Sequence, residues 1–250
     1  MDKIQVIQYL LSEIDGKTYL EIGVEYGMSF CPIVAPRKIA VDPLPASTQV
    51  RAYLLQHLKA TYYQTTSDDF FAQKGHIFDE KKIDVALVDG LHTYAQSLRD
   101  VENCLMRLNT NGLIVMHDCN PLTESAAASW TSLGSPEFVN WIWNGDVWKT
   151  IAYLRSCRDD INVFVLNCDY GLGIISKAEP ENMLNLSGAQ IDEMTFKDLD
   201  NNREKILNLK SQEYLFEFME KRALFGHLFI SPRVGEESSL SSGRCEAVKR

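Results

Sequence analysis

The chain has 250 residues, of which 45% are hydrophobic and 24% are charged, as expected for a globular protein with a sizeable core. This composition excludes a disordered chain, a collagen-like fibre and a coiled coil, and no apolar run reaches the roughly 18 residues of a membrane span. The net charge of -9 disfavours nucleic acid as a partner, because it repels phosphate backbones. The start of the sequence lacks a basic and then apolar signal segment, so we expect a cytoplasmic protein without a membrane partner.

Short apolar runs alternate with helical segments along the first half of the chain. The expected strands are residues 17–22, 38–41, 61–65, 83–88 and 113–116. Helical spacing of apolar residues predicts helices at 49–58 and 94–108. Strands that are apolar throughout and separated by helices predict an α/β fold, doubly wound around a mostly parallel sheet.

The pattern changes after Pro121. Residues 123–135 predict a loop, and residues 136–158 predict a helix that is interrupted near residue 144. The later elements are expected strands at 161–166 and 173–176, a single amphipathic helix at 203–222 and a flexible tail at 235–250. We therefore expect a main domain at 1–177, a C-terminal helical extension at 178–234 and the tail.

A glycine motif follows the first strand. Gly23 and Gly27 come directly after Glu21, and glycines at such a strand-to-helix turn let a ligand approach the backbone closely. The spacing differs from the G-x-G-x-x-G motif of dinucleotide-binding folds. An acidic residue before the glycines suits a cationic or amine-bearing ligand, although a tight turn with an exposed glutamate would give the same pattern.

Carboxylates also follow the second and third strands. Asp42 ends the second strand about twenty residues after the glycines, where a carboxylate can take the ribose hydroxyls of a nucleoside. A solvated carboxylate before a proline turn is the alternative. Asp68 and Asp69 follow the third strand, where they can cap a helix and can also face an adenine amino group.

Four polar residues follow two strands that should be neighbours in the sheet. Asp89 and His92 come after residues 83–88, and His117 and Asp118 come after residues 113–116. Open α/β sheets bind their ligands at the carboxyl ends of the strands, so these side chains should converge there. Such a group is either a site for a hard divalent metal or an acid–base pair, whereas a single aspartate at a strand end can simply cap a helix.

Taken in this order, the motifs resemble those of class I S-adenosylmethionine-dependent methyltransferases, and most closely the subgroup called methyltransferase family 24. Residues 145–149 and 169–173 also resemble that subgroup, and the resemblance covers about residues 15–177. It implies a seven-stranded sheet whose last strand is antiparallel, and it makes 1–177 the methyltransferase domain.

The resemblance also assigns roles to the predicted site residues. It implies that Glu21, Gly23 and Gly27 lie against the methionine part of S-adenosylmethionine, and that Asp42 takes the ribose hydroxyls. Asp68 or Asp69 would lie near the adenine, and Asp89 would also line the cofactor site.

A related branch of O-methyltransferases binds magnesium with one acidic residue after the fourth strand and a pair after the fifth. Asp89 and Asp118 match two of these positions, but His117 stands where that branch carries a carboxylate. We therefore expect either Mg²⁺ or another divalent metal at Asp89, Asp118 and His117, or a metal-free site in which His117 or His92 is the base beside Asp89.

The expected activity is O-methylation of a small hydroxylated acceptor, such as a sugar or a phenol. Tryptophans after residue 129 could supply flat walls for such a ring, although they could equally be core residues: Trp130, Trp141, Trp143 and Trp148. The alternatives are N-methylation of a small amine and a nucleoside-binding module without turnover. The sequence leaves the oligomeric state open, including a homo-oligomer.

Overall fold

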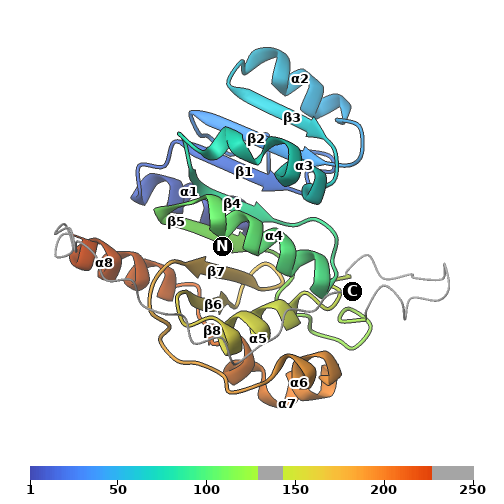
Figure 1. The fold of residues 1–250 in the computed structure, drawn as a ribbon, viewed down its shortest axis with the longest axis vertical. Coiled ribbons are helices and arrows are strands. Elements are labelled where there is room, and N and C mark those ends of the chain that lie inside the picture. The colour runs from blue at the N-terminus through green and yellow to red at the C-terminus, as the bar shows by residue number, and fades with distance from the viewer. Residues whose placement is uncertain (129–142, 227–250) are drawn as a thin grey trace.

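The computed structural model describes residues 1–128 and 143–226 of the chain. Its centre is one eight-stranded sheet in the order β3-β2-β1-β4-β5-β7-β6-β8, in which only β7 runs antiparallel to its neighbours (Figure 1). The strands are β1 (Thr18–Ile22), β2 (Arg37–Asp42), β3 (Ala60–Gln64), β4 (Ile83–Val88), β5 (Leu108–Met116), β6 (Asn162–Leu166), β7 (Leu172–Ser176) and β8 (Leu209–Lys210). The predicted α/β fold with a mostly parallel sheet is confirmed.

Helices cover both faces of this sheet. The helices are α1 (Lys3–Glu13), α2 (Thr48–Gln56), α3 (Ser67–Lys74), α4 (Tyr94–Arg107), α5 (Trp148–Cys157), α6 (Gly188–Glu193), α7 (Phe196–Leu207) and α8 (Tyr214–Gly226), with a 3-10 turn η1 (Gly75–Phe78). Helices α3 to α7 pack on one face, and α1, α2 and α8 pack on the other. Both faces of β4 are buried, because Ala86 points to the first core and Leu87 to the second. Two-sided burial explains why the central strands are apolar throughout.

Several elements differ from the sequence prediction. The expected helix at 203–222 is wrong: α7 stops before Asn208, whose φ of 47° is left-handed, and β8 and α8 follow. This β8 pairs with β6, so the sheet has eight strands rather than seven. The expected helix at 136–158 begins only at Trp148 in the described part of the chain, and α1 was not predicted at all.

Some expectations lie outside the described residues. These are the tail at 235–250, part of the loop at 123–135, Trp130 and Trp141. The division into domains stays a prediction, although residues of the expected extension supply β8 to the main sheet and α7 to one of its cores. No helix among the described residues is long and apolar enough to cross a membrane.

The strand order determines where a ligand can bind. The chain leaves the sheet centre in opposite directions from β1 and β4, which are adjacent and parallel. The loops after these two strands therefore diverge and leave a crevice at their carboxyl ends, the usual ligand position in doubly wound folds.

Candidate active site

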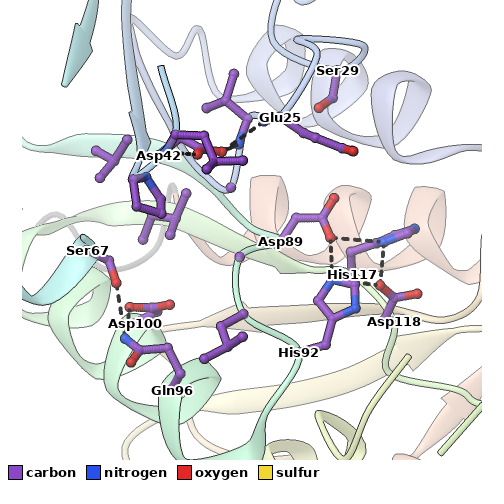
Figure 2. Close-up of a pocket in the computed structure, with 18 of the residues that line it drawn as sticks. Glu25, Ser29, Asp42, Ser67, Asp89, His92, Gln96, Asp100, His117 and Asp118 are labelled. Atoms are coloured by element: carbon purple, nitrogen blue, oxygen red, sulfur yellow. Dashed lines mark hydrogen bonds and ion pairs between the residues drawn. The ribbon is translucent and has the colours of Figure 1, made fainter. Parts of the chain in front are cut away.

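A cavity of about 770 Å³ opens at the carboxyl ends of β1, β2, β4 and β5 (Figure 2). Of the predicted site residues, it is lined by Gly23, Asp42, Asp68, Asp89, His92, His117 and Asp118. Glu21, Gly27 and Asp69 are not part of its lining. One continuous space thus joins the glycine loop after β1 to the polar residues after β4 and β5.

Position 23 must be a glycine, because a side chain there would collide with the backbone of the loop after β4. Its φ is 83°, and a Cβ atom there would lie 2.0 Å from the carbonyl oxygen of Asp89. The loops after β1 and β4 can therefore touch only because Gly23 has no side chain. Gly27 also has a positive φ of 79°, but its missing Cβ makes room for Val50 of α2. It shapes the loop and does not face the cavity.

Glu21 is fully buried and does not line the cavity. Its carboxylate accepts hydrogen bonds from the hydroxyls of Tyr19 and Ser29, the latter at 2.7 Å. Burial raises the pKa of Glu21 to about 7, although both hydrogen bonds lower it. Ser29 lines the cavity, so its hydrogen bond connects Glu21 to the lining.

Asp42 organises the glycine loop as well as lining the cavity. Its Oδ2 accepts the backbone N–H groups of Val24 and Glu25 at 2.8 and 2.9 Å, and its Oδ1 accepts that of Leu44 at 2.8 Å. The side chain is 6% exposed. The bonds to Val24 and Glu25 hold the loop where Glu25 has a left-handed conformation with a φ of 46°. The sequence predicted a ligand contact here and missed this structural role.

The two aspartates after β3 have different surroundings. Asp68 lines the cavity, whereas Asp69 accepts a hydrogen bond at 2.9 Å from the hydroxyl of Thr66, the residue that caps α3. The polar group beside Asp68 was not predicted. Gln96 of α4 donates from Nε2 to Ser67 at 3.1 Å and to Asp100 at 3.0 Å, as Figure 2 shows. Burial raises the pKa of Asp100 to about 6.

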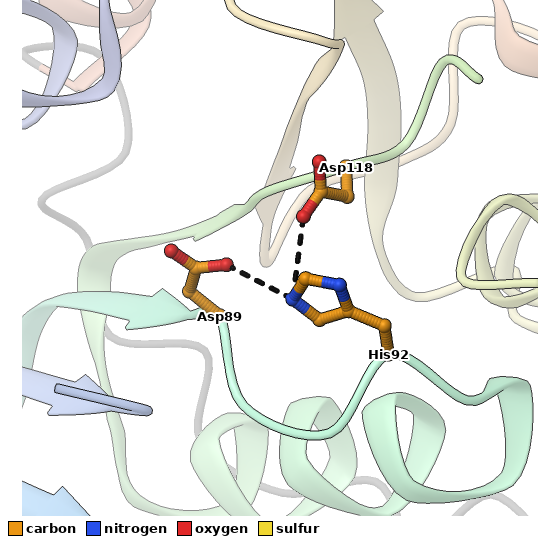
Figure 3. A group of neighbouring side chains, drawn as sticks. All are labelled: Asp89, His92 and Asp118. Carbon is orange, nitrogen blue, oxygen red and sulfur yellow. Dashed lines mark ion pairs between the residues drawn. The ribbon is translucent and has the colours of Figure 1, made fainter. Parts of the chain in front are cut away.

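The polar residues after β4 and β5 form one cluster. His92 Nε2 lies 3.5 Å from Asp89 Oδ1 and 3.3 Å from Asp118 Oδ2 (Figure 3). His117 Nδ1 lies 3.2 Å from the same atom of Asp89 and 3.1 Å from the same atom of Asp118. Both imidazoles therefore face the same two carboxylate oxygens.

The charges of the cluster are strongly coupled. Burial alone would raise the pKa of Asp89, but hydrogen bonds from His117 and His92 hold it well below its usual range. Burial alone would lower the pKa of His117, but Asp118, Asp169 and Asp89 raise it to about 11. The same carboxylates, Asp89 and Asp118, raise the pKa of His92 against the effect of burial.

Asp89, His92 and Asp118 can each offer one ligand atom to a metal ion, and these atoms lie within 4.8 Å of one another. The sequence predicted His117 rather than His92 beside the two carboxylates. In the structure His92 completes this group, and His117 contacts the same two oxygens from the side of β5.

Lys3 and Asp169 join the cluster although neither was predicted as a site residue. Lys3 Nζ donates to Asp89 Oδ2 at 2.6 Å, and the backbone N–H of Lys3 donates to Asp169 Oδ2 at 2.7 Å. Asp169 Oδ1 lies 3.5 Å from His117 Nε2. The signal for Lys3 was present: Asp2 and Gln5 form a capping box, and apolar residues follow at helical spacing.

The described tryptophans have different roles. Trp143 lines the cavity, and its ring lies 5.4 Å from that of His92. Trp148 is 1% exposed and belongs to the core, so the core alternative holds for this residue.

Residues 20–119 match the model of a family described as a methyltransferase domain. No curated protein matches the sequence. Among solved structures, the chain is similar to the methyltransferase PaMTH1 of Podospora anserina with S-adenosylhomocysteine bound. The two are 15% identical with a TM-score of 0.51, and the match covers 71% of this chain and 78% of that one.

Two further solved structures show the same fold. Cofactor-bound Rv0187 from MTB is 12% identical with a TM-score of 0.51, over 72% of this chain and 82% of that one. The O-methyltransferase TomG of Streptomyces achromogenes, involved in tomaymycin synthesis and bound to S-adenosylmethionine, is 12% identical with a TM-score of 0.50, over 70% and 79%. Residues 20–119 of this chain thus match a methyltransferase domain, and the chain shares the fold of these solved structures.

Proposed function

We propose that the protein transfers the methyl group of S-adenosylmethionine to a hydroxyl of a small acceptor. The observation that carries this proposal is the continuity of the cavity, which runs from the glycine loop to the cluster around Asp89. Methyl transfer is an in-line displacement, so the acceptor oxygen must lie close to the sulfonium methyl. A single cavity with a cofactor end and a polar end meets this requirement.

The residues at the cofactor end fit S-adenosylmethionine. The side chain missing at Gly23 leaves the backbone open to the cavity, and Asp42 lies at the end of β2. Further hydrogen-bond donors and acceptors follow beyond Asp42, on Asp68, Gln96 and Asp100. In this arrangement Asp42 takes the ribose hydroxyls, and the polar group around Gln96 faces the adenine amino group.

The residues at the other end fit a divalent metal. The contacts of both imidazoles with the carboxylates measure 3.1 to 3.5 Å, longer than the roughly 2.7–2.9 Å of a charge-assisted hydrogen bond. Such spacing suits atoms that share a central ion. Asp89, His92 and Asp118 would hold it, and the imidazole favours manganese or a softer ion over magnesium. The ion would lower the pKa of the acceptor hydroxyl.

The chain's own residues then position the acceptor. His117 directs Nδ1 at two carboxylates and Nε2 at Asp169, so neither nitrogen faces the acceptor as a base. Exposed apolar side chains line the cavity mouth: Tyr26, Met28, Leu91 and Tyr170. With Trp143 they suit a flat acceptor such as a phenol or the apolar face of a sugar ring. A cytoplasmic location and a homo-oligomer stay predictions.

Calorimetry with S-adenosylhomocysteine tests the cofactor end. We expect binding by the wild type, weaker binding by Asp42→Asn, and unchanged binding by the control Asp69→Ala, whose side chain contacts Thr66 and does not line the cavity. Turnover with panels of phenols, sugars and small amines, read as S-adenosylhomocysteine formed, then tests the acceptor class. Binding without turnover on any panel would contradict the proposed methyltransferase activity. Turnover on amines alone would contradict O-methylation.

A further inference from the structure

Four consecutive residues, 143–146, contact the loop after β4 and also Asp118, which follows β5. Trp143 accepts a hydrogen bond through its carbonyl from His92 Nδ1 at 2.8 Å. The side-chain amide of Asn144 donates to Asp118 Oδ1. Gly145 packs against the His92 backbone, and Asp146 accepts the backbone N–H of Tyr94 at 2.6 Å. Part of this segment belongs to a motif for which the sequence offered no role.

The contact of Trp143 determines which nitrogen of His92 is free. A carbonyl oxygen can only accept, so His92 Nδ1 must carry the hydrogen of this bond. In the neutral imidazole, Nε2 then carries the lone pair, and Nε2 is the atom that faces Asp89 and Asp118. A histidine that ligates a metal usually donates its other ring N–H in this way.

The contact of Asn144 orients Asp118. Asp118 has a φ of 62°, a left-handed conformation that a neighbouring contact must stabilise. Its Oδ2 faces the imidazoles, and its Oδ1 is taken by Asn144. Asn144 is fully buried, and its own amide oxygen has no hydrogen-bond partner in the described part of the chain. The hydrogen bond to Asp118 therefore determines the orientation of the Asn144 side-chain amide.

Gly145 and Asp146 hold the backbone around His92 in place. Gly145 has a φ of 67°, and a Cβ atom there would lie 1.8 Å from the His92 carbonyl oxygen. Asp146 is half-buried and closes the first turn of α4, two residues after His92. Backbone and side chain of His92 are thus both held by this segment.

We propose that residues 143–146 form a positioning segment that sets His92 and Asp118 in the geometry required to bind a divalent metal. The segment contacts two of the three candidate ligands and supplies none itself, and of its four residues Trp143 lines the cavity. This inference rests on the metal site of the proposed function.

The test measures Mn²⁺ affinity by calorimetry on the full chain, together with S-adenosylhomocysteine affinity and the melting temperature. Asn144→Leu removes the donor to Asp118, and we expect Mn²⁺ affinity to fall by about 10–100-fold, the usual loss for a residue that orients a ligand. S-adenosylhomocysteine affinity should stay unchanged, because Asn144 does not line the cavity. The matched control is Asn109→Leu, which removes a similar amide bond to Asp84 at 3.0 Å, at the opposite end of β5.

A second pair keeps the test decisive if Asn144→Leu does not fold. Asp146→Ala removes the acceptor for the Tyr94 N–H and should weaken Mn²⁺ binding, whereas Asp146→Asn keeps an acceptor oxygen and should restore it. Wild-type affinity in Asp146→Ala, or equal loss in Asp146→Asn, would overturn the positioning role alone. A wild-type protein that binds S-adenosylhomocysteine but no Mn²⁺ would overturn the metal site and this inference, and would leave the methyltransferase assignment intact.

Discussion

Replacing Glu21 by glutamine should change how the stability of the protein depends on pH. Glu21 is fully buried, and its pKa of about 7 compares with 4.5 for an exposed glutamate. Between these two values the folded chain holds a proton that the unfolded chain has lost. A raised carboxyl pKa therefore contributes stability that is fully present below pH 4.5 and is lost as the pH rises through 7.

The size of the effect follows from the two pKa values. Each tenfold difference in proton affinity corresponds to about 1.4 kcal/mol, so the ionised carboxylate destabilises the folded state by about 3 kcal/mol above pH 7. A glutamine side chain at this position would carry no charge and would still accept the hydroxyl of Ser29 through its amide oxygen. The Glu21→Gln protein should therefore match the wild type at low pH and exceed it at about pH 8.

Urea unfolding of both proteins between about pH 5 and 8 measures this difference. The free energy of unfolding of the wild type should fall with rising pH relative to the variant, and the gap should reach about 3 kcal/mol. Glu25→Gln is the control, because Glu25 lies in the loop directly after β1 but is exposed. Parallel pH profiles for the wild type and Glu21→Gln would refute the raised pKa and the burial argument behind it.

Four further changes have expected outcomes. Asp42→Ala leaves three backbone N–H groups without their acceptor, so the free energy of unfolding should fall by at least about 2 kcal/mol in urea, with Asp42→Asn in between. Gly23→Ala should lower the melting temperature strongly, while Gly188→Ala, where a Cβ meets no atom within 4 Å, should not. Chelator should abolish turnover, and Asp118→Asn should weaken Mn²⁺ binding in calorimetry. Lys3→Met removes the lysine paired with the buried Asp89, so the protein should unfold at lower urea concentration while the surface variant Lys17→Met does not.

The sequence predicts the sheet well, because strands that are buried on both faces are apolar along their whole length. Residues 83–88 are apolar almost throughout, and the structure has β4 at these residues, buried on both faces. Parallel strands place their carboxyl ends at one edge, so the residues that follow β4 and β5 are brought together by topology alone. The proximity of Asp89, His92 and Asp118 could therefore be predicted without knowing how their side chains are oriented.

Prediction failed where a local signal competes with helical periodicity. Residues 203–222 keep an apolar spacing across Asn208, but this residue is left-handed and ends α7. Asparagine tolerates that conformation, so it is a usual helix stop, and the continuing apolar pattern concealed it. The two aspartates after β3 could not be told apart in the sequence. Asp69 accepts the Thr66 hydroxyl, and Asp100 reaches the cavity from α4, where its spacing gives no sign of a site residue.

The polar cluster shows why the strands determine the place of a site but not its geometry. Each carboxylate points one oxygen at the imidazoles, and its other oxygen is held by Lys3 on Asp89 and by Asn144 on Asp118. Both holding residues lie outside the matched segment 20–119. A free carboxylate at a strand end would rotate, so its useful orientation depends on the helix before the domain and on the segment after it. Residues 20–119 therefore carry the proposed ligand atoms, whereas Lys3 and Asn144, outside that segment, hold their carboxylates in place.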